Sequence, residues 1–135
     1  MGAIQTPMYG EAFGPDLVVN GGFSSSSDWT LPSTWAISGG TANYTPGASG
    51  PMYQIFFPSV SAYNATYRLT FDITSGIGSV YVVLVGDVIA LGATRAGVGT
   101  YTEDLYLPGY YTTIRVHAAS ADAVSIDNIS LVRIY

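Results

Sequence analysis

The last stretch of the chain, Ala123–Tyr135, reads AVSIDNISLVRIY and decides how the rest is organised. Apolar residues alternate with polar ones up to Ile126, skip at Asp127-Asn128, and alternate again from Ile129. An irregularity in a period-two pattern is typical of a β-bulge, because the extra residue changes which side chains face the core. No turn signal follows Asn128, so the stretch predicts a long central or closing strand of a sheet.

A second apolar stretch, Asp16–Phe23 (DLVVNGGF), lies towards the other end of the chain. It predicts a short strand that stops at an Asn-Gly-Gly turn. A jelly roll closes when its first and last strands lie in the same region. We therefore expect the two stretches to be neighbours.

Short strand patterns fill the sequence between them. Ala65–Thr74 (ATYRLTFDIT) alternates most cleanly, which is typical of an antiparallel strand with one buried face, whereas Ser79–Val85 is apolar on both faces. Gly39-Gly40 predicts a hairpin turn. The other expected strands are Thr41–Thr45, Met52–Phe57 (ended by Pro58), Val88–Leu91, Thr100–Leu107 and Thr112–Ala118. This spacing predicts an all-β fold, an antiparallel jelly-roll β-sandwich of about 8–10 strands over residues 16–135.

Residues 1–15 form a separate segment in this interpretation. They contain scattered prolines and glycines and no periodicity, so we expect an extended N-terminal arm. The arm is apolar enough to lie across the domain or a neighbouring subunit, through Ile4, Met8, Tyr9 and Phe13. It has neither a basic region nor an apolar core typical of a signal peptide, so we expect synthesis in a cytoplasm without one.

Composition excludes several classes of protein. The absence of cysteine excludes disulfides and thiol chemistry. Apart from His117, the four basic residues are all arginines, and the net charge of −5 argues against a nucleic-acid partner. No apolar run approaches the length of a membrane span, so no membrane partner is expected.

Charged side chains are scarce for a chain with 48% hydrophobic residues. A chain of this mass exposes about 6,800 Å², which leaves roughly 500 Å² for each charged side chain. Large apolar patches usually mark partner surfaces, so we expect a homo-oligomer in which Tyr81, Val83 and Val85 of the two-faced strand contribute to subunit packing. The alternative is a monomer coated with Ser, Thr, Gly and Tyr.

The residues whose chemistry could support catalysis are not arranged for it in the sequence. His117 shares the polar side of its strand with Thr113 and Arg115, and no nucleophile is placed beside it by the sequence. Adjacent Glu103 and Asp104 point to opposite faces of one strand, so they are not the carboxylate pair of a glycosidase. We therefore expect neither an enzyme nor a cofactor, and a structural role for Asp72 and Asp127.

The order of these motifs resembles carbohydrate-binding-module jelly rolls of the galactose-binding-like superfamily. The resemblance rests on LVVNGGF followed by a tryptophan loop, on ATYRLTFDIT, and on SIDNISL as the closing strand. In sugar-binding relatives, an acidic residue after the first motif and the closing aspartate help to hold a structural calcium. Here Ser24 stands at the first position, so no metal site is expected, and Asp127 remains only a weak structural-calcium candidate.

Sugar recognition needs exposed aromatic rings, and 11 tyrosines are available. The candidates for a carbohydrate site are Tyr81, Tyr101, Tyr106, Tyr110 and Tyr111. Trp29 and Trp35 are expected instead to pack in the core against the first strand. Tyrosines are also enriched at protein interfaces, which is the competing interpretation.

Two functions follow. Related modules also occur in bacteriophage structural proteins, so the leading hypothesis is a non-enzymatic virion protein, a capsid decoration (cement) or tail-associated protein. It would oligomerise, as a trimer, and dock through residues 1–15 on virion proteins such as the major capsid protein. The alternative is a glycan-binding module or phage adhesin that recognises host-surface carbohydrate.

Overall fold

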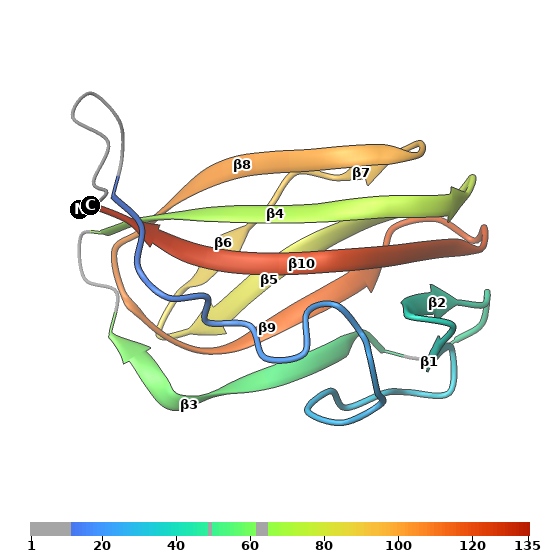
Figure 1. The fold of residues 1–135 in the computed structure, drawn as a ribbon, viewed down its shortest axis with the longest axis horizontal. Helices are drawn as coiled ribbons and strands as arrows, with labels where there is room; N and C mark the ends of the chain where they lie inside the picture. Colours follow the sequence, from blue (N-terminus) through green and yellow to red (C-terminus); the bar gives the residue numbers. More distant parts are fainter. Residues whose placement is uncertain (1–11, 49, 62–64) are drawn as a thin grey trace, which may run out of the picture.

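Two antiparallel sheets pack face to face in the computed structural model, which describes residues 12–48, 50–61 and 65–135 (Figure 1). Sheet I contains, in spatial order, β1 (Trp35–Ser38), β2 (Thr41–Tyr44), β10 (Val124–Ile134), β4 (Ala65–Gly76) and β8 (Gly99–Leu107). Sheet II contains β3 (Met52–Ser61), β9 (Tyr110–Ala118), β5 (Ser79–Gly86) and β6 (Ile89–Leu91), and β7 (Arg95–Ala96) pairs with β5. The described residues contain no helix, so the expected all-β sandwich is confirmed.

The core lies between the sheets and follows the alternation in the sequence. On β4 every second side chain from Tyr67 to Ile73 is buried, as predicted for one face of a half-buried strand. Both tryptophans belong to this core, Trp29 at 6% and Trp35 at 3% exposure. Each large apolar side chain that is fully buried contributes about 1.5–3 kcal/mol, so this shared interior holds the two sheets together.

The predicted bulge in the closing strand is confirmed. Asp127 pairs with Asp72, but the next paired residue on β10 is Ser130, opposite Thr70. Asn128 has a φ of 50°, a left-handed conformation that Asn tolerates better than most residues. The extra residue lets Ile126 and Ile129 both face the core although an odd number of positions separates them.

The first apolar stretch is close to the last one, as expected, but the prediction that it forms a strand is wrong. Its backbone follows β10 through isolated hydrogen bonds: Leu17 N–H donates to the Leu131 carbonyl (2.9 Å) and Ile129 N–H to the Gly21 carbonyl (3.0 Å). A regular ladder is interrupted because the Asp16 carboxylate accepts hydrogen bonds from the N–H groups of Val18 (3.0 Å) and Leu131 (3.1 Å). In Figure 1 this blue segment begins beside the red end of β10.

Two amide side chains hold this segment and the following loop in place. The Asn20 amide nitrogen donates to the carbonyls of Ser25 and Ser27, and its oxygen accepts from the N–H of Ser24. Gln54, which is only 5% exposed, points inward from β3 and bonds both backbone polar groups of Val19 at 2.7–2.8 Å. The buried amide of Gln54 therefore fixes the segment to sheet II, whereas Asn20 holds the following loop together.

Two further expectations concern turns and strand ends. Gly39 and Gly40 have φ values of 62° and 78°, which are the values of the predicted hairpin turn, of type I′. The expectation that Pro58 ends the third strand is wrong, because β3 continues to Ser61. Proline is tolerated there because the ladder with β9 is irregular between Ile55 and Val60.

Candidate functional site

The outer face of sheet II carries the most distinctive set of side chains. The register places Tyr53 of β3 and Val83 of β5 directly opposite Arg115 of β9, one on each side. Tyr81 lies opposite His117 in the neighbouring row. Side chains opposite each other in an antiparallel sheet have Cβ atoms about 4.5–5.5 Å apart, so these five residues form one continuous surface.

A hollow of about 530 Å³ opens on this face above β3 and β9. Its floor consists of Tyr53, Ile55, Thr113 and Arg115, and its walls consist of Thr30, Leu31, Pro32, Gly50 and Pro51. The wall is held to the floor because Thr30 and Tyr53 exchange backbone hydrogen bonds of 2.8 and 3.1 Å. The wall at Thr30 is therefore attached to the edge of sheet II by backbone hydrogen bonds, and this attachment fixes one side of the hollow.

The chemistry of the hollow combines an aromatic ring, apolar walls and a cation. Tyr53 supplies a ring with a hydroxyl, and Thr30 and Thr113 supply hydroxyls that both donate and accept. Arg115 supplies only donors. Among the described residues, no carboxylate lines the hollow and no ion pair is found for Arg115.

Beside the hollow, the rings of Tyr81 and His117 stack with centroids 4.8 Å apart and an interplanar angle of 3°. Burial lowers the pKa of His117, and the positive charge of Arg115 lowers it further. His117 is therefore neutral at pH 7. The stacked pair gives the face a flat, uncharged aromatic patch next to the cation of the hollow.

The outer face of sheet I differs in chemistry. The Arg68 guanidinium binds the Asp104 carboxylate at 2.8 Å, which lowers the pKa of Asp104. Asp72 accepts hydrogen bonds from the Thr100 hydroxyl (2.7 Å) and the Asn128 amide (2.8 Å). The carboxylates of this face are satisfied within the chain, and the structural role predicted for Asp72 agrees with these contacts.

The tyrosines predicted for sugar binding are dispersed. Tyr81 lies on the outer face of sheet II, half-buried against His117, whereas Tyr106 is 57% exposed on the outer face of sheet I. Tyr101 points inward and donates its hydroxyl to the Ala96 and Gly97 carbonyls. Tyr110 is half-buried at the start of β9.

The expectation that Tyr111 is an exposed platform is wrong, because its side chain is 1% exposed. The register of β9 against β5 shifts between the Val85–Thr113 pair and the Gly86–Tyr111 pair. This irregularity turns Tyr111 into the core, where parity alone would place it differently.

The predicted interface residues also separate. Ile4, Met8 and Tyr9 lie outside the described residues. Val83 is only 6% exposed within the single chain, and Val85 is half-buried, so Val83 offers little surface to a partner.

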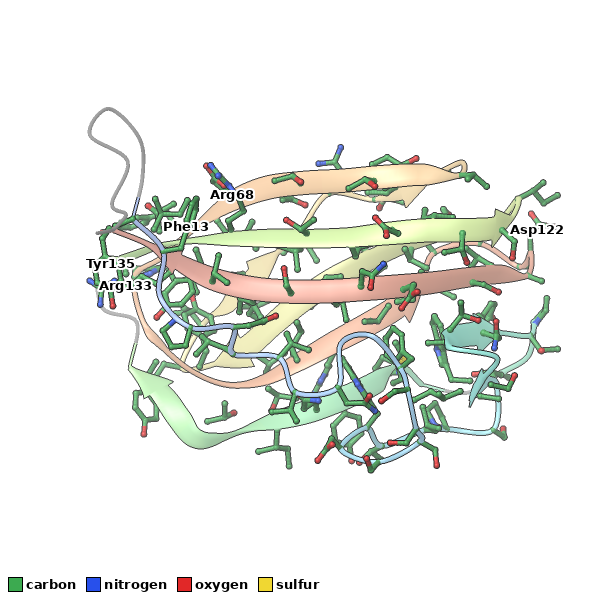
Figure 2. All side chains as sticks on the ribbon, in the orientation of Figure 1. Phe13, Arg68, Asp122, Arg133 and Tyr135 are labelled. Atoms are coloured by element: carbon green, nitrogen blue, oxygen red, sulfur yellow. The ribbon has the colours of Figure 1, made fainter. Side chains whose placement is uncertain are left out.

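At one end of the sandwich, Figure 2 shows Phe13 near Arg68, and Arg133 near Tyr135. The Arg68 guanidinium lies 5.4 Å from the Phe13 ring centroid, and the Arg133 guanidinium lies 4.7 Å from that of Tyr135. Phe13, which is 50% exposed, therefore contacts its own domain, and the rest of the expected arm up to residue 11 lies outside the described residues.

Asp127, the weak calcium candidate, lies on β10 opposite Asp72 of β4. The Asp127 carboxylate accepts a hydrogen bond from the N–H of Asn128 at 2.8 Å. In the part of the chain that the structure describes, no three His, Asp or Glu side chains gather as a metal-binding group. Nor does this part contain a helix that could cross a membrane.

Tyr53 and Arg115 were not predicted as binding residues. The aromatic strand Met52–Phe57 and the polar parity of Arg115 with His117 were visible in the sequence. What could not be seen is that β3 and β9 are neighbours in the register Tyr53–Arg115. The signal that could have indicated a site is Arg115 itself, a single cation whose neighbours on the same face of the strand, Thr113 and His117, are not acidic.

Comparisons with known proteins agree with the fold. No family model matches the sequence, and no curated protein matches it. Among solved structures, a point variant of a family 29 carbohydrate binding module is 13% identical, covering 90% of this chain and 92% of that chain with a TM-score of 0.53. A family 4 module is 16% identical, covering 85% and 98% with a TM-score of 0.56. This chain therefore has the jelly-roll sandwich fold of carbohydrate-binding modules.

Proposed function

We propose that this protein is a non-catalytic carbohydrate-binding protein and that glycans bind in the hollow on the outer face of sheet II. The observation that carries the proposal is the hollow itself. It places an aromatic ring, Tyr53, directly across from a set of hydrogen-bond donors on Arg115, within apolar walls. Binding sites of this kind are concave, mostly apolar and marked by a few polar groups that fix orientation.

The structural comparisons support this function over the expected virion role. A family 29 module with the same fold was solved with cellulohexaose bound; it is 14% identical and covers 90% of this chain and 91% of that chain, with a TM-score of 0.53. A fold supports many functions, so the site must carry the argument. Here the site and the fold point to the same class of ligand.

Each group in the hollow has a task in this proposal. The ring of Tyr53 packs against the C–H face of a sugar, because both surfaces are apolar and flat enough to exclude water. The guanidinium of Arg115 and the hydroxyls of Thr30 and Thr113 bond the sugar's oxygens. The register of β3 with β9 fixes the backbones of Tyr53, Thr113 and Arg115 relative to one another, so these strands need no rearrangement on binding.

Titration of wild-type protein and a Tyr53→Ala variant against a glycan panel tests the proposal. We expect Tyr53→Ala to weaken binding by about 5–30-fold, the loss typical of truncating a central aromatic contact. The matched control is Tyr106→Ala, which removes an exposed tyrosine from the opposite face and should leave affinity unchanged. Absence of binding to every glycan, or an equal loss in both variants, would contradict the proposal.

Self-association is the second candidate, and the expected bacteriophage capsid or tail role belongs with it. It is favoured by aliphatic side chains exposed on and beside β6: Val88 at 44%, Ile89 at 69% and Leu91 at 63%. A homo-oligomer would cover them. Light scattering at increasing concentration tests this, with Ile89→Ser/Leu91→Ser as the variant, and a 14.2 kDa particle at every concentration would exclude it.

A further inference from the structure

The four arginines of the chain are not equivalent. Arg68 binds Asp104 at 2.8 Å, and Arg95 lies 3.8 Å from Glu103 with its guanidinium 5.5 Å from the Tyr101 ring centroid. Arg133 lies over the Tyr135 ring. Arg115 alone, among the residues that the structure describes, has neither an ion pair nor a ring contact, and it lines the hollow.

Among the described residues, the side chains of the hollow supply hydroxyl oxygens as acceptors but no carboxylate or amide oxygen. Sugar hydroxyls both donate and accept, so a site for them benefits from carboxylate or amide oxygens as well as donors. The side chains that line this hollow include no Asp, Glu, Asn or Gln. Its strongest polar group is a guanidinium, which is always charged and presents a planar fork of donors that matches a carboxylate.

None of the carboxylates that the structure describes lines the hollow. Asp72 and Asp104 are on the outer face of sheet I, across a sandwich whose sheets pack about 10 Å apart. Asp28 precedes the wall at Thr30, but its carboxylate accepts a hydrogen bond from the Ser27 hydroxyl (3.2 Å). Charges on the far face are largely screened at physiological ionic strength, where the Debye length is about 8 Å, so the net charge of −5 does not decide the potential inside the hollow.

We propose that the hollow selects glycans that carry carboxylate groups, that is, polymers containing uronic acids, and that Arg115 is the group that binds the carboxylate. This inference rests on the proposed carbohydrate function and names its ligand class. The Tyr53 ring packs against the sugar while the guanidinium, directly opposite on β9, forms charge-assisted hydrogen bonds to the acid. An uncharged sugar leaves the guanidinium with weaker partners.

The test compares three acidic polymers, polygalacturonate, alginate and hyaluronate, each with the same polymer after reduction of its carboxyl groups to alcohols. We expect at least one acidic form to bind at least about tenfold more tightly than its reduced form, as charge-assisted hydrogen bonds predict. Arg115→Gln should abolish that preference, and Arg115→Lys should retain part of it because the charge remains but the fork is lost. Thermal melting of each variant confirms that it is folded.

Arg68→Gln is the matched control. It makes the same change of charge and shape on the opposite face, so the preference for the acidic polymer should persist. Equal binding of acidic and reduced forms, or a preference that survives Arg115→Gln, overturns this inference. If only neutral glycans bind and Tyr53→Ala weakens them, this inference fails while the proposed carbohydrate function stands; if no glycan binds, both fail.

Discussion

The outer faces of the two sheets cover the same core but present opposite chemistry. On sheet I, charged groups are engaged with one another, as in the Arg68–Asp104 pair, and hydroxyls fill the spaces between them. On sheet II, Arg115 stands without a counter-ion among the described residues, surrounded by aromatic and aliphatic side chains. Where polar groups bond one another, few of them are free to bind a ligand. A cation without a counter-ion beside an aromatic ring is free to do so.

The largest effect on glycan affinity is expected when a carboxylate is placed beside Arg115 on sheet II, as Asp104 lies beside Arg68 on sheet I. Thr113→Glu places a carboxylate on the same face of β9 as Arg115, two residues away, where it competes for the guanidinium. We expect affinity for an acidic glycan to fall by about 30-fold or more. Thr102→Glu, the same substitution on the outer face of β8, is the control, and an equal loss in both variants would indicate a non-local effect of charge.

The outer face of sheet II also contributes to stability. Val83 is 6% exposed although it points away from the core, so Val83→Ala should lower the free energy of unfolding by about 1–2 kcal/mol through lost burial and packing. Thr70→Ala on the outer face of sheet I should change it by less than about 0.5 kcal/mol. Urea unfolding measures both, and similar values would show that the two faces are equally solvated.

The two outer faces should lose stability in different pH ranges, and His117 on sheet II responds at the higher pH. Burial, and then Arg115, lowers the pKa of His117 in the folded protein below its ordinary value of about 6.5. The unfolded chain therefore takes up a proton first as pH falls, so the free energy of unfolding decreases below about pH 6.5. Comparing melting temperatures of wild-type protein and His117→Gln between pH 7.5 and 5 measures this, and the variant should lose that dependence.

Asp104 on sheet I titrates in a lower range. The Arg68 side chain, through its hydrogen bond and its charge, holds the pKa of Asp104 below its usual range, so this carboxylate stays ionised while His117 titrates. Its stabilising contribution is present above about pH 4 and is lost as pH falls through the lowered pKa. In acid unfolding, Asp104→Asn should therefore be less stable than wild type above about pH 4, and the difference should disappear as pH falls through the lowered pKa.

The smallest effect is expected for the Arg68–Asp104 pair at neutral pH. Its side chains are 27% and 41% exposed, and exposed ion pairs contribute about 0.2–1 kcal/mol. A double-mutant cycle with Arg68→Gln and Asp104→Asn should give a coupling energy in that range that shrinks in 1 M salt. A coupling much above 1 kcal/mol would mean that this face is more rigid than a solvated surface.

The sequence predicted what depends on local pattern. The alternation Tyr67–Ile73, the Gly39-Gly40 turn and the bulge at Asn128 were readable because each imposes a local conformation. The apolar residues of Asp16–Phe23 predict a strand, which the structure does not contain. The Asp16 and Asn20 side chains instead bond backbone groups that a ladder would use, and such competition depends on tertiary contacts.

The site was less accessible to sequence reasoning. Tyr53 and Tyr111 look alike in an aromatic-rich sequence, yet one lines the hollow and the other is buried. Whether each tyrosine is exposed or buried depends on strand pairing and on a register shift in β9, and neither of these has a sequence signal of its own. Counting tyrosines therefore included Tyr111, which is buried, and did not include Tyr53, which lines the hollow.

The antiparallel course of the first described residues along β10 determines how the domain responds to mechanical load. The carbonyl of Ala12 accepts from Tyr135, the N–H of Gly14 donates to Arg133, and the contacts continue inward to Leu17 with Leu131. Tension applied between residue 12 and residue 135 pulls the first described residues away from β10, so these hydrogen bonds bear the load one after another. The domain would consequently unzip from this pole at low force, while β4 and β10, paired along most of their length, would resist until later.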